Sequence, residues 1–139
     1  MQVSKIKMFV LLLSWTIISP AKASDYYSTL TGTISHIRDG DTIEVGNIPI
    51  RIAALNCPEN DTPEGQFASA FALQFKGSKV ICELTGAMSY KRLVGYCRIG
   101  KNDFATTLIE NTNCKIWPKY DVWQRLSLIH ISEPTRLGF

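Results

Sequence analysis

Short runs of alternating apolar and polar residues, divided by tight-turn signals, most constrain the fold of this 139-residue chain. Residues 30–37 alternate as a half-buried strand does, and Asp39-Gly40-Asp41 follows as a turn. Residues 42–45 predict a second strand, and Gly46-Asn47 a second turn, because both residues tolerate positive φ. Residues 48–55 predict a third strand, so this half of the chain is expected to form a three-stranded meander.

A helix signal follows the meander. Thr62-Pro63-Glu64 combines an N-cap residue, a proline at the first helical position and an acid in the first turn. Apolar residues between 67 and 75 give much of one helical face, and Gly77 can end the helix. The elements expected after it are a strand at 79–84, a loop at 86–92, a strand at 93–99 and a helix capped by Asp103 that runs to about residue 111.

The order of these elements, β-β-β-α-β-β-α, argues against alternating βαβ units. It predicts an α+β fold that is mainly β: a five-stranded barrel of OB type with two or three helices. An open α+β sandwich is the alternative. The candidate domain, residues 24–125, has the size of one small domain and can bury only a modest core.

The first residues have the features of a secretory signal peptide. Lys5 and Lys7 precede an apolar run at residues 8–18, and Ala21-Lys22-Ala23 is a small-x-small cleavage pattern. We expect residues 1–23 to be removed and the protein to be secreted or periplasmic, with no stable membrane association after cleavage. An uncleaved anchor is the alternative, but the run is short for a bilayer span.

The other end of the chain is expected not to be native protein. Residues 126–136 read LSLIHISEPTR, which is similar to a translated sequencing-library adapter. We therefore expect residues 126–139 to be a non-native tail, with the natural C-terminus of the domain missing. A genuine polar tail after an ordinary helix is the alternative.

The charge of the expected mature chain is close to neutral. The sequence has 15 basic and 12 acidic residues, and three of the lysines belong to the expected signal peptide. A broad basic surface that holds nucleic acid by counterion release is therefore excluded. Any contact with nucleic acid has to come from a local cluster of basic residues.

Four cysteines, in a chain that is expected to be exported, indicate disulfides. Their spacing does not resemble a zinc site, because no C-x-x-C motif or nearby histidine pair accompanies them. His36 is the only histidine before the suspected tail, and a single histidine on a strand is more often structural than a ligand.

Acidic and basic residues gather in short blocks that together suit the cleavage of a phosphodiester. The blocks are Asp39-Gly40-Asp41-Thr42, Arg51, Asn56-Cys57-Pro58-Glu59 and Tyr90-Lys91-Arg92. Carboxylate and carbonyl oxygens suit a hard cation such as Ca²⁺, and a carboxylate can orient or deprotonate water. Arginines can bind a phosphate with two hydrogen bonds and stabilise the charge that grows on it.

The order and spacing of these blocks resemble the staphylococcal nuclease (thermonuclease) family over most of residues 31–120. The resemblance implies an SNase-like OB-fold endonuclease, a hydrolase that cuts DNA or RNA with the help of Ca²⁺ or another divalent cation. It implies catalytic roles for Glu59, which would activate water, and for Arg51 and Arg92, which would stabilise the phosphate. We further expect a monomer whose partner is nucleic acid.

The resemblance also implies a set of metal ligands. These are the carboxylate of Asp41, the side chain of Asn56 and the backbone carbonyl of Cys57. The family has aspartate where this chain has Asn56, which keeps a carbonyl oxygen but removes one negative charge. We therefore expect weaker cation binding, because Ca²⁺ affinity follows ligand charge.

Three further residues are expected to bind the substrate. Tyr90 and Tyr120 fall where the family has tyrosines near the nucleotide. Lys91 replaces a family glycine, so the turn is less able to use positive φ, but its charge beside Arg92 can help to hold a phosphate. The family's closing helix would lie after Tyr120.

Each of these residues also has a structural interpretation. Asp41 suits a hairpin turn, and for Asp39 that role is the favoured one. Arg51 lies in an apolar strand and therefore needs an anionic partner, which Asp41 could supply whether or not the site is functional. Glu59 and Arg92 could be solvated surface groups, and the two tyrosines could pack on the barrel rim.

The cysteines fit the same barrel as two pairs. Cys82 and Cys97 lie on the strands that flank the 86–92 loop, and antiparallel pairing would bring their sulfurs together. The remaining pair, Cys57 with Cys114, would tie the loop that carries Glu59 to the segment after the second helix. Buried free thiols are the alternative.

Two other classes of function remain open. Asn56 and the near-neutral charge motivate a catalytically weakened OB module that binds nucleic acid or a protein partner. OB barrels serve as binding scaffolds as readily as catalytic ones, so the fold does not decide between these classes. The last alternative is a structural exported domain whose arginines only pair with acids.

Overall fold

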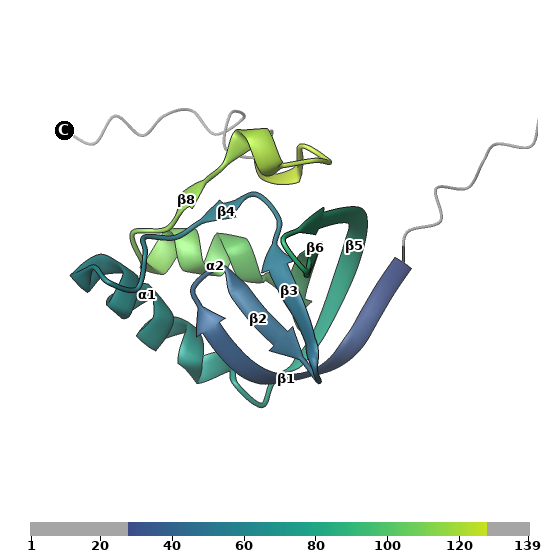
Figure 1. The fold of residues 1–139 in the computed structure, drawn as a ribbon, viewed down its shortest axis with the longest axis horizontal. Coiled ribbons are helices and arrows are strands. Elements are labelled where there is room, and N and C mark those ends of the chain that lie inside the picture. Colours follow the sequence, from purple (N-terminus) through teal and green to yellow (C-terminus); the bar gives the residue numbers. More distant parts are fainter. Residues whose placement is uncertain (1–27, 128–139) are drawn as a thin grey trace, which may run out of the picture.

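The computed structural model describes residues 28–127, which form a closed β-barrel flanked by helices (Figure 1). The barrel strands are β1 (Ser28–Asp39), β2 (Thr42–Val45), β3 (Ile48–Ile52), β5 (Lys79–Ser89) and β6 (Arg92–Ile99). The shorter strands are β4 (Leu55–Asn56), β7 (Asn102–Asp103) and β8 (Lys115–Ile116). The expected signal peptide, residues 1–23, and residues 128–139 of the expected tail lie outside the described residues, so both stay predictions.

Parallel pairing between β3 and β6 closes the barrel. The strands run in the order β3-β2-β1-β5-β6, and every other pair of neighbours in the ring is antiparallel. Closure pairs the two strands that would be the edges of an open sheet, β3 and β6. The predicted five-stranded OB-type barrel in an α+β fold is confirmed, and the open sandwich is excluded.

The third predicted strand is wrong at its end. The meander of β1, β2 and β3 is present, but β3 stops at Ile52 instead of continuing to residue 55. Ala54 has a φ of 61°, a left-handed conformation that interrupts a strand. Its N–H donates to the Tyr120 carbonyl at 3.2 Å, and its carbonyl accepts the Trp117 N–H at 2.6 Å. These bonds redirect the chain into β4, which pairs with β8.

The first predicted helix is confirmed as α1 (Pro63–Ala72). Thr62 caps it, because its hydroxyl oxygen accepts the Gly65 N–H at 3.1 Å. The helix tightens into a 3-10 turn, Leu73–Phe75, before Gly77. Gly77 has a φ of 88°, so it turns the chain toward β5 in a conformation that favours glycine.

The second predicted helix is confirmed as α2 (Phe104–Asn111). Asp103 caps it, and its carboxylate accepts the Thr106 N–H at 2.8 Å. Phe104 at the start of α2 meets Phe75 edge to face, with ring centroids 5.7 Å apart. This contact joins the two helical segments over the core.

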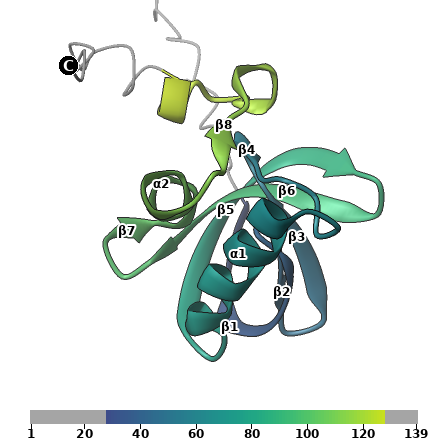
Figure 2. The same ribbon diagram turned by 90° about the vertical axis from the view of Figure 1, so that its left-hand side faces the viewer.

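The core lies between the barrel and its helices, and α1 runs across the barrel strands in Figure 2. Small residues on α1, Ala68 and Ala72, are completely buried and let the helix come close to the sheet. The large buried side chains come from the strands and from α2: Ile34, Ile43, Ile50, Ile52, Val80, Phe104 and Leu108. Burial of these side chains is the main favourable term in folding.

The β5–β6 hairpin extends further than the sequence predicted. The 86–92 segment is not a loop, because β5 continues to Ser89 and β6 begins at Arg92, directly opposite. Only Tyr90 and Lys91 form the turn. The pairing register shifts between Leu84 and Met88, which breaks the alternation on which a strand prediction relies.

Both expected disulfides are present. Cys82 and Cys97 are directly opposed on β5 and β6, and Cys57–Cys114 joins the residue after β4 to the residue before β8. Two disulfides are consistent with an extracellular or periplasmic protein. None of the helices among residues 28–127 is long and apolar enough to cross a membrane.

Asp121 anchors the last described segment. Its buried carboxylate accepts the Tyr96 hydroxyl and the backbone N–H groups of Arg125, Leu126 and Ser127. Leu126 lies in the core, with 2% of its surface exposed. The bonds at residues 126 and 127 use backbone donors, so they do not depend on which side chains stand there.

Candidate active site

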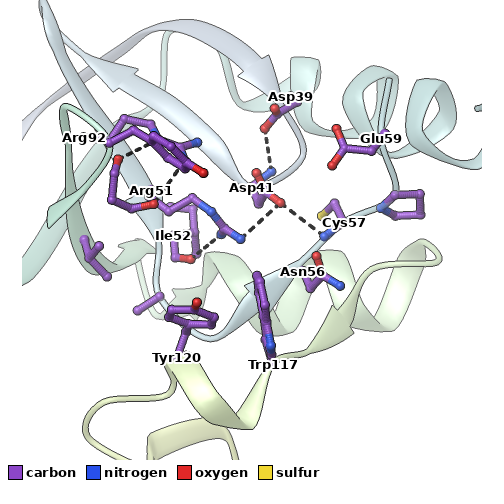
Figure 3. A pocket seen from close by; sticks show the side chains of 15 residues that line it. Asp39, Asp41, Arg51, Ile52, Asn56, Cys57, Glu59, Arg92, Trp117 and Tyr120 are labelled. Carbon is purple, nitrogen blue, oxygen red and sulfur yellow. Dashed lines mark hydrogen bonds and ion pairs between the residues drawn. The ribbon is translucent and has the colours of Figure 1, made fainter. Parts of the chain in front are cut away.

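A pocket of about 430 Å³ opens beside the β1–β2 turn, between β3, the loop after β4 and the segment after β8 (Figure 3). Every expected site residue except Lys91 lines it: Asp41, Arg51, Asn56, Cys57, Glu59, Tyr90, Arg92 and Tyr120. These residues come from segments far apart in the chain. The structure thus brings together eight of the nine residues that were expected to form the site.

The β1–β2 turn places two carboxylates at the pocket. Asp39 Oδ1 accepts the N–H of Asp41 at 3.1 Å, which fixes the turn. Gly40 between them is buried against the Cys57–Cys114 disulfide, and a Cβ there would lie 2.7 Å from Cys57 Sγ. The position therefore requires glycine, and the turn is tied to the disulfide by close packing.

Asp41 is held from three directions. Its Oδ2 accepts the Cys57 N–H at 3.2 Å and lies 3.4 Å from Arg51 Nη2, and its Oδ1 accepts the Thr42 hydroxyl at 3.3 Å. Burial raises the pKa of Asp41 from 3.8 to about 6, against the positive charge of Arg51, which lowers it. The nearby negative charge of Asp39 raises the pKa further. At neutral pH the negative charge of the Asp41 carboxylate is therefore only partly compensated by Arg51.

Arg51 reaches the pocket from β3. Its side chain is 13% exposed, and its Nη1 donates to the Ile52 carbonyl at 2.8 Å. Burial lowers the pKa of Arg51, and the positive charge of Arg92 lowers it further. The ion pair with Asp41 confirms the structural interpretation of Arg51, while its position on the pocket wall leaves the catalytic role open.

Arg92 reaches the pocket from the start of β6. Its Nη1 donates to Thr42 Oγ1 at 2.7 Å, and its Nε donates to the Ser89 carbonyl at 3.1 Å. Its guanidinium carbon lies 5.9 Å from the centroid of the Tyr90 ring. Neutral oxygens thus fix the guanidinium, and Arg92 has no salt bridge within residues 28–127.

Glu59 lies on the loop that leads into α1. Its carbonyl accepts the N–H and the hydroxyl of Thr62, at 3.0 and 2.7 Å. Gly65 lies against the same carbonyl, and a Cβ on Gly65 would lie 1.8 Å from the Glu59 oxygen. The carboxylate itself is exposed and, in Figure 3, faces the side of the pocket that holds Asp39 and Asp41. The first turn of α1 therefore sets the position of Glu59.

An aromatic pair forms another wall of the pocket, and only one of its two residues was expected at the site. Trp117 and Tyr120 line the pocket with their ring centroids 4.2 Å apart, edge to face. Both side chains are partly exposed, at 37% and 45%. The sequence motifs do not include Trp117, because nothing in its sequence context indicates that it lines the same pocket as Arg51 and Glu59.

Thr42 and Asp39 also take part in the site more than their sequence context indicates. Thr42 is almost completely buried and connects Arg92 to Asp41 through its hydroxyl. Asp39 was assigned to the turn alone, yet its carboxylate lines the pocket. The D-G-D-T block carried both residues, but neighbouring residues in a turn give no sign of which ones face the site.

The pocket carries more acid than base. Its charged groups are Asp39, Asp41, Glu59, Arg51 and Arg92, which gives a formal charge of −1. Hard cations prefer oxygen ligands, which the pocket offers. A bound cation would also offset the excess negative charge, to which the raised pKa of Asp41 responds. In the described part of the chain, no three His, Cys, Asp or Glu side chains are grouped to hold a metal ion. Of the expected ligands, only Asp41 offers a carboxylate.

Comparison with protein-family models finds no match to the chain, and comparison with the curated proteins finds none either. Function is therefore inferred from the residues of the pocket.

Proposed function

We propose that the protein is an exported endonuclease that hydrolyses phosphodiester bonds of DNA or RNA. One observation carries the proposal: Asp41, Arg51, Glu59 and Arg92 converge on a single pocket from separate segments of the chain. A hydrolase of phosphodiesters needs cationic donors for the phosphate and a base for the water, and the pocket contains both.

The two arginines would bind and orient the phosphate. Carbonyl and hydroxyl oxygens hold both guanidinium groups in place. The two side chains therefore lose little conformational entropy when a phosphate binds. In the transition state, negative charge grows on the phosphate oxygens. Fixed N–H donors from Arg51 and Arg92 stabilise that charge more than they stabilise the ground state.

Glu59 would take a proton from the attacking water. The water oxygen bonds to phosphorus, the proton passes to the Glu59 carboxylate, and the bond from phosphorus to the leaving sugar oxygen breaks. The leaving oxygen takes a proton from solvent. Glu59 is exposed and has no salt-bridge partner among residues 28–127, so its carboxylate is accessible to water at the pocket.

A divalent cation such as Ca²⁺ would supply positive charge that attracts the phosphate and polarises its oxygens. The carboxylate of Asp41 and the amide oxygen of Asn56 would hold it, together with the Cys57 carbonyl that the family resemblance suggests. Asp39 adds negative charge beside them and offsets part of what Asn56 lacks.

Trp117 and Tyr120 would support a base of the substrate. Exposed aromatic rings at the edge of an OB barrel bind single-stranded bases by stacking, which contributes about 1–3 kcal/mol per base. Tyr90, 92% exposed on the opposite hairpin, offers another ring. Stacking of this kind does not read sequence, so the proposed nuclease has little sequence preference.

The proposed compartment is the periplasm or the extracellular space. The expected signal peptide and the two disulfides support export, and the protein would act as a monomer without stable membrane association.

A binding module without catalysis is the second candidate. It is favoured by Asn56, which lines the pocket where a further carboxylate would strengthen cation binding. In that case the arginines and the aromatic rings would hold nucleic acid that is not cut.

The deciding experiment measures cleavage of single-stranded DNA and of RNA by the full chain with added Ca²⁺, Mg²⁺ or Mn²⁺. Glu59→Gln should lower the rate by about a hundredfold or more, because it removes the base but keeps the shape. The matched control is Glu64→Gln, an exposed acid of α1 outside the pocket, which should cleave normally. Binding without cleavage under every cation would assign the protein to the second candidate.

A further inference from the structure

A second depression lies directly beside the candidate active site. Its walls are Arg38, Asp39, Thr42, Pro49, Tyr90, Lys91 and Arg92. Asp39, Tyr90 and Arg92 also line the first pocket, so the two hollows share a border. A chain molecule bound at Arg92 can therefore extend from one into the other.

The second depression is positive where the first pocket is negative. Arg38, Lys91 and Arg92 line the depression with one acid, Asp39, and Glu44 pairs with Arg38 from outside the lining. The formal charge is therefore +1 with Glu44 counted, against −1 in the first pocket. The expected mature chain is near neutral overall, so this is a local concentration of positive charge. Such a cluster matches the phosphate backbone of a nucleic acid.

Arg38 is oriented before any ligand arrives. Its Nε and Nη2 donate to Glu44 Oε1, at 2.9 and 2.6 Å, from the neighbouring strand β2. Nη1 has no partner within residues 28–127, and 46% of the side chain is exposed. An exposed ion pair of this kind contributes little energy, so Glu44 orients the guanidinium and competes only weakly with a phosphate for it.

Tyr90 forms the border between the two hollows. It has a φ of 50° and its side chain is 92% exposed, so the turn of the β5–β6 hairpin presents the ring to solvent. Lys91, the next residue, lines only the second depression. The same two-residue turn thus carries a ring at the border and a cation beyond it.

We propose that this depression is a second phosphate subsite, in which Arg38 and Lys91 bind the backbone of the strand one nucleotide beyond the phosphate that is cut. The inference rests on the proposed function and extends it: the substrate is a polymer that continues past the scissile bond on the Arg92 side. Arg38, which no sequence motif singles out, becomes a substrate-binding residue.

The experiment compares two substrates of the full chain, a dinucleotide and a single-stranded oligonucleotide of about six nucleotides. Arg38→Gln combined with Lys91→Gln should lower kcat/KM on the longer substrate by about tenfold, and lower it less on the dinucleotide. The dependence of binding on salt should also weaken, by about 1.4 in the slope of log K against log salt for two lost contacts. The matched control, Arg98→Gln with Lys101→Gln, removes two exposed charges outside both hollows.

Glu44→Gln separates phosphate binding from a structural role of Arg38. If Arg38 binds phosphate, removing its acidic partner should tighten binding of a phosphorothioate version of the longer oligonucleotide, whereas Arg38→Gln weakens it. If Arg38 matters only through its ion pair, both substitutions weaken binding alike, and that result overturns the subsite.

Failure of the subsite and failure of the proposed function give different results. The subsite alone is overturned if the wild type cleaves both substrates and the double variant has the same loss of kcat/KM on both, or no loss on either. A wild-type chain that neither binds nor cleaves the oligonucleotide under any divalent cation would overturn both.

Discussion

Asp41 Oδ2 lies 3.4 Å from Arg51 Nη2, yet the pKa of Asp41 is raised to about 6. Burial of the carboxylate outweighs the attraction of the arginine, and Asp39 adds repulsion. Arg51 therefore does not fully compensate the charge of the buried Asp41 carboxylate. At neutral pH it leaves a charged carboxylate in a pocket that has one acid too many, which is a favourable place for a cation.

The ionisation of Asp41 should report on that cation. We expect its carboxyl carbon to titrate near pH 6 in an NMR experiment without divalent ions, and at lower pH once Ca²⁺ is added. Arg51→Gln should raise the pKa further, because Arg51 lowers it. A titration that Ca²⁺ leaves unchanged would place the cation elsewhere.

The same shift has a defined effect on stability. The folded chain holds the Asp41 proton more tightly than the unfolded chain, so this group makes the free energy of unfolding fall as pH rises from 3.8 to about 6. Denaturant unfolding of wild type and Asp41→Asn over this range isolates the contribution. The advantage of wild type over the variant should shrink with rising pH, and a growing advantage would contradict the direction of the shift.

Asn56→Asp should strengthen cation binding. It places a second carboxylate among the proposed ligands, and one added charge near a bound cation is expected to raise Ca²⁺ affinity by about tenfold or more. Isothermal titration calorimetry measures the change. Asn113→Asp, an exposed site away from the pocket, is the control for net charge. Equal affinities in wild type and Asn56→Asp would show that Asn56 is not a ligand.

Gly65→Ala, in the first turn of α1, should displace the loop that carries Glu59. Alanine normally stabilises a helix by about 1 kcal/mol over glycine. Here its Cβ would lie 1.8 Å from the Glu59 carbonyl, so the loop has to move, and we expect a net loss of about 1–3 kcal/mol together with lower activity. Gln66→Ala, at an exposed position of the same turn, exchanges one good helix former for another without the clash. The unfolding temperature and the cleavage rate should therefore both fall in Gly65→Ala. In Gln66→Ala neither should fall.

The two disulfides should differ in their effects on stability and on activity. Cys57–Cys114 closes a loop of 57 residues and Cys82–Cys97 one of 15, so replacing each pair by alanines should cost about 4 and about 3 kcal/mol. Only the first adjoins the Asp41 turn and the Glu59 loop, so its loss should also reduce cleavage at temperatures where the chain is still folded. Equal losses of activity would mean that the site does not depend on this crosslink.

Much of the fold could be predicted because local signals agreed with it. Gly46-Asn47 lies where β2 turns into β3, Thr62 and Asp103 cap the two helices, and the alternation of residues 30–37 matches β1. Turn and cap signals depend on a few neighbouring residues, so they can be read without knowing what the segment packs against.

The deviations arise where distant segments decide the local conformation. Nothing near Ala54 in the sequence predicts its positive φ, which is held by bonds to Trp117 and Tyr120. The register shift before Met88 likewise hid the end of β5. A single sequence gives no measure of such contacts.

The candidate site followed the same division. The spacing of charged residues selected Arg51, Glu59 and Arg92 as candidates, and all three line the pocket. Trp117 belongs to the pocket only through the β4–β8 pairing, which is a contact of long sequence separation. Its participation could be found only in three dimensions.

The parallel pairing of β3 with β6 has a consequence for when the pocket exists. Arg51 sits on β3 opposite Val94, and Arg92 begins β6, so the two guanidinium groups come together only when this pair of strands meets. Contacts between such distant parts of a chain form late, since a long loop has to close first. The phosphate site that we propose is therefore not assembled in a chain that is still being synthesised or is held extended, and the proposed nuclease becomes active only after the barrel has closed.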